Sequence, residues 1–159
     1  MLVGILSDTH DNLSNLRKAV DVFNNMSVSL VLHAGDFTSG FTFRVLKDLQ
    51  ADFKGIFGNN DGDVYFLTKM SQNRIFKQPY EFVVDSKKGL MIHEHFLVDS
   101  LAASGQYDIL IYGHTHNAHV EKIGKTLIIN PGETCGWLHQ RASVAVLDTN
   151  IMDVSIVEL

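Results

Sequence analysis

The chain has 159 residues, of which 45% are hydrophobic and 19% are charged. This composition can bury a core and excludes a disordered segment, and the length predicts a single domain over residues 1–159. The formal charge of -5, from 13 Lys and Arg against 18 Asp and Glu, excludes an extended nucleic-acid interface that depends on basic residues.

Strands and helices alternate in the first half of the chain. Leu2–Leu6 has the pattern of a buried strand, and apolar residues then recur at helical spacing between Leu13 and Phe23. A strand at Leu30–Leu32, a helix at Phe41–Leu49 and a strand at Phe53–Phe57 follow. This order predicts right-handed βαβ crossovers and therefore a parallel sheet.

Strands dominate the second half of the chain. They are predicted at residues 82–84, 90–92, 109–112 and 127–129, and a hairpin is predicted from residues 143–147 and 154–157. Strands this apolar need cover on both faces, so we expect an α/β protein with two packed sheets and helices outside.

The sequence also bears on the compartment. Cys135 is the only cysteine, residues 1–6 have no basic leader, and no apolar run approaches the roughly 18 residues of a membrane span. We therefore expect a cytoplasmic protein without a membrane anchor, and the sequence leaves homo-oligomerisation open.

Side chains that bind metals follow the predicted strands of the first half. Asp8 and His10 come after the first strand, Asp36 after the second and Asn59 after the third. Taken alone, Asp8 would be better explained by a turn or a helix cap, and Asn59 by an ordinary turn. Together they are expected to meet, because ligands of open α/β sheets bind outside the carboxyl ends of the strands.

Histidines follow two strands of the second half. His93 and His95 end one of them, and His114 and His116 end another, where alternate residues of an extended segment point the same way. Mixed oxygen and nitrogen donors suit Mn, Fe, Zn or Co. Without His95, the residues that follow strands in both halves make seven candidate ligands, which would oversupply one metal but would satisfy two metals that share a carboxylate. We expect Asp36 to be that bridge.

Five motifs resemble those of calcineurin-like metallophosphoesterases. They are Asp8-Thr9-His10, Gly35-Asp36, Gly58-Asn59-Asn60-Asp61, His93 and Gly113-His114-Thr115-His116, in the family's order and spacing. Within that superfamily the chain is most similar to the small, cap-less bacterial and archaeal phosphodiesterases, whose late loop Asn130-Pro131-Gly132-Glu133 resembles. The resemblance covers residues 2–158.

The resemblance implies a four-layer α/β/β/α sandwich of two mixed sheets flanked by helices. It also implies two divalent transition-metal ions, with manganese favoured and nickel, cobalt, iron or zinc as alternatives. The metal ligands would be divided between Asp8, His10, Asp36 and His116 for one ion, and Asp36, Asn59, His93 and His114 for the other. The implied reaction is hydrolysis of a small phosphate ester by attack of a metal-bridging hydroxide.

Two positions depart from the family pattern. Asn60 stands where many members have a histidine thought to protonate the leaving group, and Asn60 cannot act as a general acid. Glu94 stands where the small relatives usually have glycine. His95 is our candidate for a substitute proton donor or for a contact to the phosphate, because an imidazole can serve in either role.

We therefore expect a dinuclear metal-dependent phosphodiesterase, with some phosphomonoesterase activity as an open alternative. A protein-binding scaffold of the same fold, like the retromer subunit, is the alternative from another class, but a scaffold needs none of the seven ligands. A nuclease of the DNA-repair branch would need additional domains and a basic groove.

Overall fold

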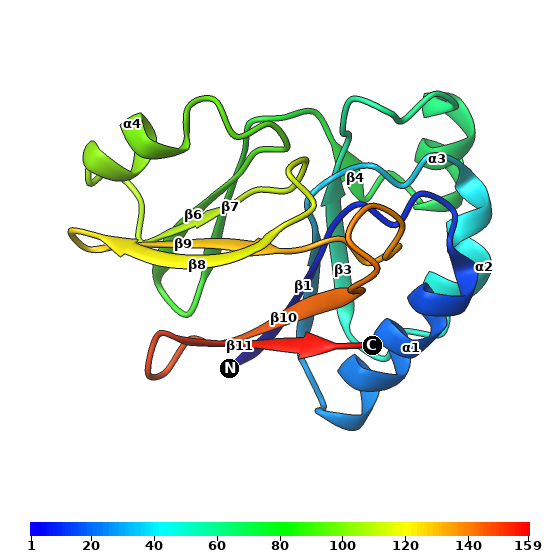
Figure 1. The fold of residues 1–159 in the computed structure, drawn as a ribbon, viewed down its shortest axis with the longest axis horizontal. Helices are drawn as coiled ribbons and strands as arrows, with labels where there is room; N and C mark the ends of the chain where they lie inside the picture. Colours follow the sequence, from blue (N-terminus) through cyan, green and yellow to red (C-terminus); the bar gives the residue numbers. More distant parts are fainter.

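Two β-sheets packed face to face form the centre of the computed structural model, which describes residues 1–159 (Figure 1). The first sheet has the strand order β11-β10-β1-β2-β3-β4. Its strands are β1 (Leu2–Leu6), β2 (Leu30–His33), β3 (Asp52–Ile56), β4 (Ile75–Phe76), β10 (Ser143–Asp148) and β11 (Asp153–Glu158). Strands β1 to β4 are parallel, and β10 and β11 add an antiparallel edge.

The second sheet has the strand order β5-β6-β7-β9-β8. Its strands are β5 (Tyr80–Val84), β6 (Lys87–Met91), β7 (Ile109–Ile111), β8 (Ala118–Ile123) and β9 (Thr126–Pro131). Strands β6, β7 and β9 are parallel, whereas β5 and β8 pair antiparallel at the two edges. Both sheets are therefore mixed, as predicted.

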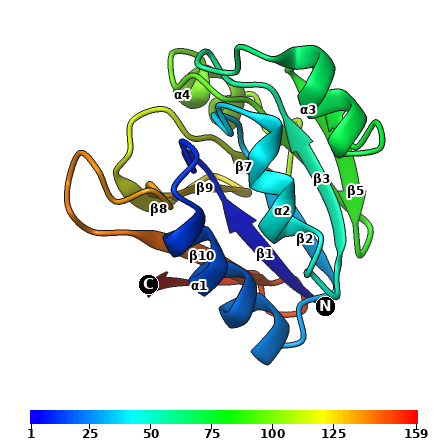
Figure 2. The same ribbon diagram turned by 90° about the vertical axis from the view of Figure 1, so that its right-hand side faces the viewer.

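Helices cover the outer faces of the two sheets. The first sheet is covered by α1 (Leu13–Asn25), the 3-10 turn η1 (Gly40–Thr42), α2 (Phe43–Leu46) and α3 (Val64–Met70), which lie together in front of it in Figure 2. Helix α4 (Val98–Ala103) lies on the other side of the molecule, over the second sheet (Figure 1). The predicted four-layer α/β/β/α sandwich is confirmed.

The alternation of side chains along β1 explains why its sequence is apolar throughout. Val3 and Ile5 are fully buried between the two sheets, whereas Leu6 is fully buried against the helices. A strand in an inner layer has no wet face, so it reads as a continuous apolar run. Helix α1 begins after its cap Asn12, whose side chain accepts a hydrogen bond from the Asn15 N–H at 3.2 Å.

The predicted helix over Phe41–Leu49 is wrong in extent. Regular α-helix covers only Phe43–Leu46, preceded by a single 3-10 turn. The reason is a contact from another helix: the Asn24 side chain donates to the Asp48 carbonyl and accepts from the Gln50 N–H, both at 3.0 Å. These bonds satisfy the backbone in a turn and end the helix early.

Four short elements of the structure have no counterpart in the sequence prediction: α3, β4, α4 and β8. Strand β8 is exposed along almost its whole length, so it lacks the apolar alternation that marks a half-buried strand. The hairpin near the C-terminus is confirmed as β10 and β11, with Ser143 opposite Glu158. No helix in the structure has the length and hydrophobicity that a membrane-spanning segment requires.

Candidate metal centre

The loops that follow β1, β2 and β7 hold their polar residues in an unusual backbone conformation. Positive φ angles occur at Asp8 (52°), His10 (40°), Asp36 (62°), His114 (67°) and His116 (62°). Residues other than glycine adopt this left-handed region at a cost, and such residues concentrate at functional sites. Five of the seven predicted metal ligands therefore share a strained backbone conformation.

Asp8 is fully buried, and its two carboxylate oxygens have different surroundings. Oδ2 accepts a hydrogen bond from the His114 N–H at 3.1 Å, whereas Oδ1 has no hydrogen-bond partner. Oδ1 lies 3.4 Å from His116 Nε2 and 3.8 Å from His10 Nε2. Burial raises the pKa of Asp8. A buried carboxylate oxygen without a donor, facing two imidazole nitrogens, suits a cation between the three groups.

Asp36 lies between two histidines. Its Oδ2 is 3.5 Å from His10 Nε2 and 3.4 Å from His93 Nε2. Burial acts to raise the pKa of Asp36, but the hydrogen bond and charge of His93 and two hydrogen bonds from Asn60 more than offset it, so the pKa lies below its usual range. The Asp36 carboxylate is therefore negatively charged and lies close to both His10 and His93.

Asn59 joins the remaining histidines. Its Oδ1 is 2.8 Å from His93 Nε2 and 2.9 Å from His114 Nδ1. His93 is fully buried; burial alone would lower its pKa, but the charge and hydrogen bond of Asp36 raise it to about 9. The negative field that holds a proton on His93 would equally attract a divalent cation, which competes for the same nitrogen.

All nine residues predicted for the site are therefore in one cluster. The seven predicted ligands contact one another in an unbroken chain: Asp8, His10, Asp36, Asn59, His93, His114 and His116. Asn60 donates to Asp36 from both its backbone N–H and its side-chain amide, each at 2.8 Å. The His95 ring stacks on His114 with 5.8 Å between ring centroids.

The donor set fits divalent metal ions. Asp8, His10 and His116 each offer one ligand atom, and these atoms lie within 4.8 Å of one another, as do those of Asp8, Asp36 and His93. Two carboxylates, imidazole nitrogens and one amide oxygen make a mixed set that suits a first-row transition metal better than calcium or magnesium.

Glu133 is a carboxylate beside the cluster for which the sequence predicts no role. It is fully buried and its Oε2 lies 2.8 Å from His116 Nδ1, so the His116 ring can donate there and turn the Nε2 lone pair toward Asp8. The same oxygen accepts from the Trp137 and Leu138 N–H groups at 3.1 and 3.0 Å. The loop of residues 130–133, which resembles a family motif, was the only sequence signal.

The Glu133→Gln variant is expected to lose stability in a pH-dependent way. Burial acts to raise the pKa of Glu133, but hydrogen bonds from His116 and from backbone N–H groups lower it from 4.5 to about 2. A depressed pKa stabilises the fold above the unfolded value of 4.5, and this contribution disappears as the pH falls toward 2. In metal-free protein, the variant should be about 3 kcal/mol less stable than wild type at pH 7.

Urea unfolding of both proteins between pH 7 and pH 2 measures this difference. The gap in free energy of unfolding should narrow as the pH falls from about 5 toward 2, because Glu133 of wild type is protonated in the unfolded chain below its pKa of 4.5 but stays ionised in the folded protein down to about pH 2. A gap that stays constant over this range would show that the charge of Glu133 does not stabilise the loop.

Comparison with known proteins places the chain in a family. Residues 1–152 match the model of the calcineurin-like phosphoesterase superfamily domain, and the chain belongs to this family. Among curated relatives, phosphodiesterase MJ0936 of Methanocaldococcus jannaschii is 38% identical, over 94% of this chain and 93% of the relative. Phosphodiesterase YfcE of Escherichia coli is 26% identical, over 93% of this chain and 88% of the relative.

Solved structures give the same result for the fold. A structure described as a novel archaeal phosphodiesterase superposes with a TM-score of 0.94 and 36% identity, over 100% of both chains. Vps29 of Entamoeba histolytica, in complex with zinc, superposes with a TM-score of 0.73 and 20% identity, over 99% of this chain and 91% of that one. This second likeness concerns the fold alone.

Proposed function

We propose that this protein is a metal-dependent phosphodiesterase that hydrolyses a small phosphate ester at the cluster described above. The observation that carries the proposal is the buried Oδ1 of Asp8, which has no hydrogen-bond donor and faces the Nε2 atoms of His10 and His116. Two of the relatives, MJ0936 and YfcE, are phosphodiesterases by name, which supports the same reaction class.

Two divalent transition-metal ions, manganese first among them, are proposed to bind side by side. Asp8, His10, Asp36 and His116 would hold one ion, and Asp36, Asn59, His93 and His114 the other. Asp36 is the natural shared ligand because its Oδ2 lies near a histidine of each group, at 3.5 Å from His10 and 3.4 Å from His93. When bound, such ions polarise a phosphoryl oxygen and lower the pKa of a bound water.

The protein's own residues prepare the site for a phosphate anion. The His93 ring lies with Nδ1 2.8 Å from the Ala34 carbonyl, and His116 is held by Glu133, so both Nε2 atoms are directed into the cluster. Asn60 fixes Asp36 through two hydrogen bonds. His95 lies beside His114, where it can donate a proton to the leaving group or contact the phosphate.

Metal analysis coupled to a hydrolysis screen tests the proposal. Protein stripped with a chelator and reloaded with Mn, Co, Ni, Fe or Zn is expected to bind two ions per chain and to hydrolyse aryl phosphodiesters, and chelation should abolish the activity. One ion at saturation with full turnover would contradict the shared-ligand assignment.

A protein-binding scaffold is the second candidate function. The observation in its favour is the fold likeness to Vps29, with a TM-score of 0.73. The complete set of seven donors argues against it, since a scaffold needs none of them. Absence of hydrolysis with every metal, across aryl diesters, cyclic nucleotides and monoesters, would favour the scaffold.

The dependence of rate on the leaving group should reveal the proton donor. Asn60 has no titratable proton and its amide already donates to Asp36, so aryl diesters should react far faster than alkyl diesters. General acid catalysis typically contributes about 10²–10⁴-fold, and its absence penalises alkoxide leaving groups most. If His95 supplies the proton, the wild-type dependence will be shallow and His95→Ala will steepen it.

The measurement is kcat/KM for a series of leaving groups on wild type, Asn60→His and His95→Ala, with chemistry confirmed as the slow step. Asn60→His should flatten the dependence if position 60 is the place for a donor. A shallow wild-type dependence that neither substitution changes would exclude both positions from proton transfer.

A further inference from the structure

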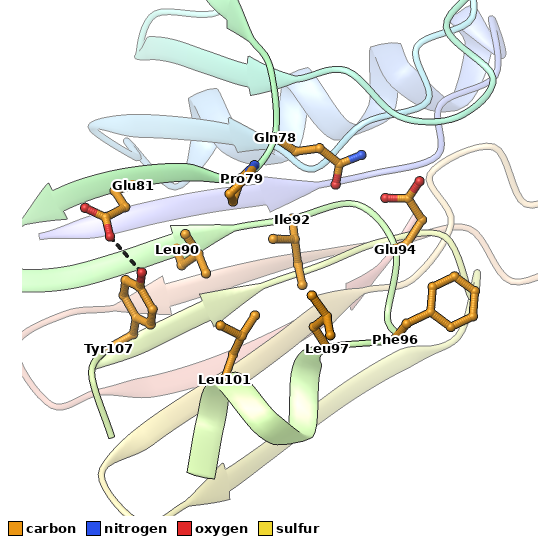
Figure 3. A pocket seen from close by; sticks show the side chains of 10 residues that line it. All are labelled: Gln78, Pro79, Glu81, Leu90, Ile92, Glu94, Phe96, Leu97, Leu101 and Tyr107. Atoms are coloured by element: carbon orange, nitrogen blue, oxygen red, sulfur yellow. Dashed lines mark hydrogen bonds between the residues drawn. The ribbon is translucent and has the colours of Figure 1, made fainter. Parts of the chain in front are cut away.

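An apolar pocket of about 680 Å³ lies on the outer face of the second sheet, between β6 and helix α4 (Figure 3). Leu90 and Ile92 line it from β6 and the residues after that strand, and Leu97 and Leu101 line it from the helix side. The volume falls within the range of about 300–1,000 Å³ typical of small-molecule sites.

The pocket adjoins the proposed metal centre. Its lining residue Gln78 accepts a hydrogen bond from the His93 N–H at 2.7 Å, and Phe96 stands at the end of the pocket nearest Glu94 in Figure 3. The Phe96 ring lies 4.5 Å from the His95 ring and 6.3 Å from the His114 ring, measured between centroids. One aromatic side chain thus borders both the pocket and the cluster.

Phe96 and Leu97 are also unusually exposed for apolar residues, at 75% and 62%. A ligand that covers exposed apolar side chains at the border of a site removes their surface from water, and this burial favours its binding. Because Phe96 lies next to His95 and His114, the substrate itself is the natural occupant.

The charges around the pocket restrict what can enter it. No lysine or arginine lines it, whereas two carboxylates do, Glu94 near the cluster and Glu81 at the far end. Glu81 accepts from the Tyr107 hydroxyl at 2.7 Å and pairs with Lys88 at 3.2 Å, so its charge is already matched. Glu94 has no such partner among the ion pairs of the structure, and its carboxylate would repel a second anionic group.

We propose that this pocket binds one ester substituent of the phosphodiester, and that it selects a substituent that is apolar, aromatic in size and uncharged. This inference rests on the proposed function, because the phosphate would have to lie at the metal centre while the substituent passes Phe96. Glu94, which stands where the small relatives usually have glycine, would then exclude diesters in which the substituent that enters the pocket is anionic.

Binding of two phosphodiesters to metal-free protein, in which they are not hydrolysed, tests the pocket without requiring activity. Diphenyl phosphate should bind about 10- to 100-fold more tightly than dimethyl phosphate, since one ring becomes buried. Methyl resonances of Ile92, Leu97 and Leu101 should shift in the NMR spectrum with the first probe only. In Leu97→Asp the affinity ratio should fall at least threefold, whereas Ile151→Asp, a matched change at a remote exposed residue, should leave it unchanged.

A charged probe tests the role of Glu94. Methyl 4-carboxyphenyl phosphate, whose only aromatic substituent carries a charge, should bind wild type more weakly than methyl phenyl phosphate, and Glu94→Gln should reduce that difference. An affinity ratio that Leu97→Asp does not change, or methyl resonances that do not move, would overturn the proposal. Absence of hydrolysis by the metal-loaded enzyme, with binding intact, would instead count against the proposed function alone.

Discussion

Asp36→Asn should remove metal from both proposed positions at once. The neutral amide has only one good ligand oxygen and no charge, whereas the Asp36 carboxylate lies within 3.5 Å of a histidine from each proposed ligand group. The loss in metal affinity should exceed the roughly 10–100-fold that removal of an outer-shell partner causes. Titration with Mn or Co and counting of bound ions gives the stoichiometry, and kcat/KM on an aryl diester should fall with it.

Two further variants make the result specific. His116→Ala should weaken chiefly one position, because His116 contacts Asp8 and Glu133 but not Asp36. Asp21→Asn, an equal change of charge on an exposed residue of helix α1, should leave metal binding unaffected. Equal loss from both positions in Asp36→Asn and His116→Ala would remove the case for Asp36 as the bridge.

Gly58→Ala is expected to damage the site through packing. A Cβ at position 58 would lie 2.2 Å from Asp36 Oδ1 and 2.5 Å from the Asp36 backbone nitrogen. That nitrogen cannot move freely, since it donates to Asp61 Oδ2 at 3.1 Å, and the same oxygen accepts from the Gly58 N–H at 2.8 Å. Overpacking of this kind typically costs about 1–3 kcal/mol, and the displaced Asp36 should also bind metal poorly.

Gly62→Ala is the matched control in the same loop. A Cβ at position 62 would meet no atom within 4 Å, and the residue has no positive φ angle. This substitution should change the free energy of unfolding by less than about 1 kcal/mol, with a small gain from the stiffer unfolded chain. Urea unfolding and metal titration of both variants provide the comparison, and equal effects of the two would contradict close packing between the loops.

The order of chemical groups along the sequence determined most of the fold and the composition of the cluster. The inner strands β1 and β7 were predictable because both their faces are buried, which makes their sequences apolar throughout, and β2 and β9 were predictable from their apolar segments Leu30–Leu32 and Leu127–Ile129. Parallel strands end at one edge of a sheet, so the sequence alone predicts that Asp8, Asp36 and Asn59 meet.

Only the tertiary structure decided the features that depend on contacts between distant segments. The end of helix α2 depends on Asn24, the orientation of His116 depends on Glu133, and the engagement of Asn60 depends on Asp36. None of these partners lies at a spacing that a local pattern can reveal. The pocket beside Phe96 likewise exists because helix α4 packs over β6. The sequence alone does not predict that the outward-facing residues of β6 line a cavity.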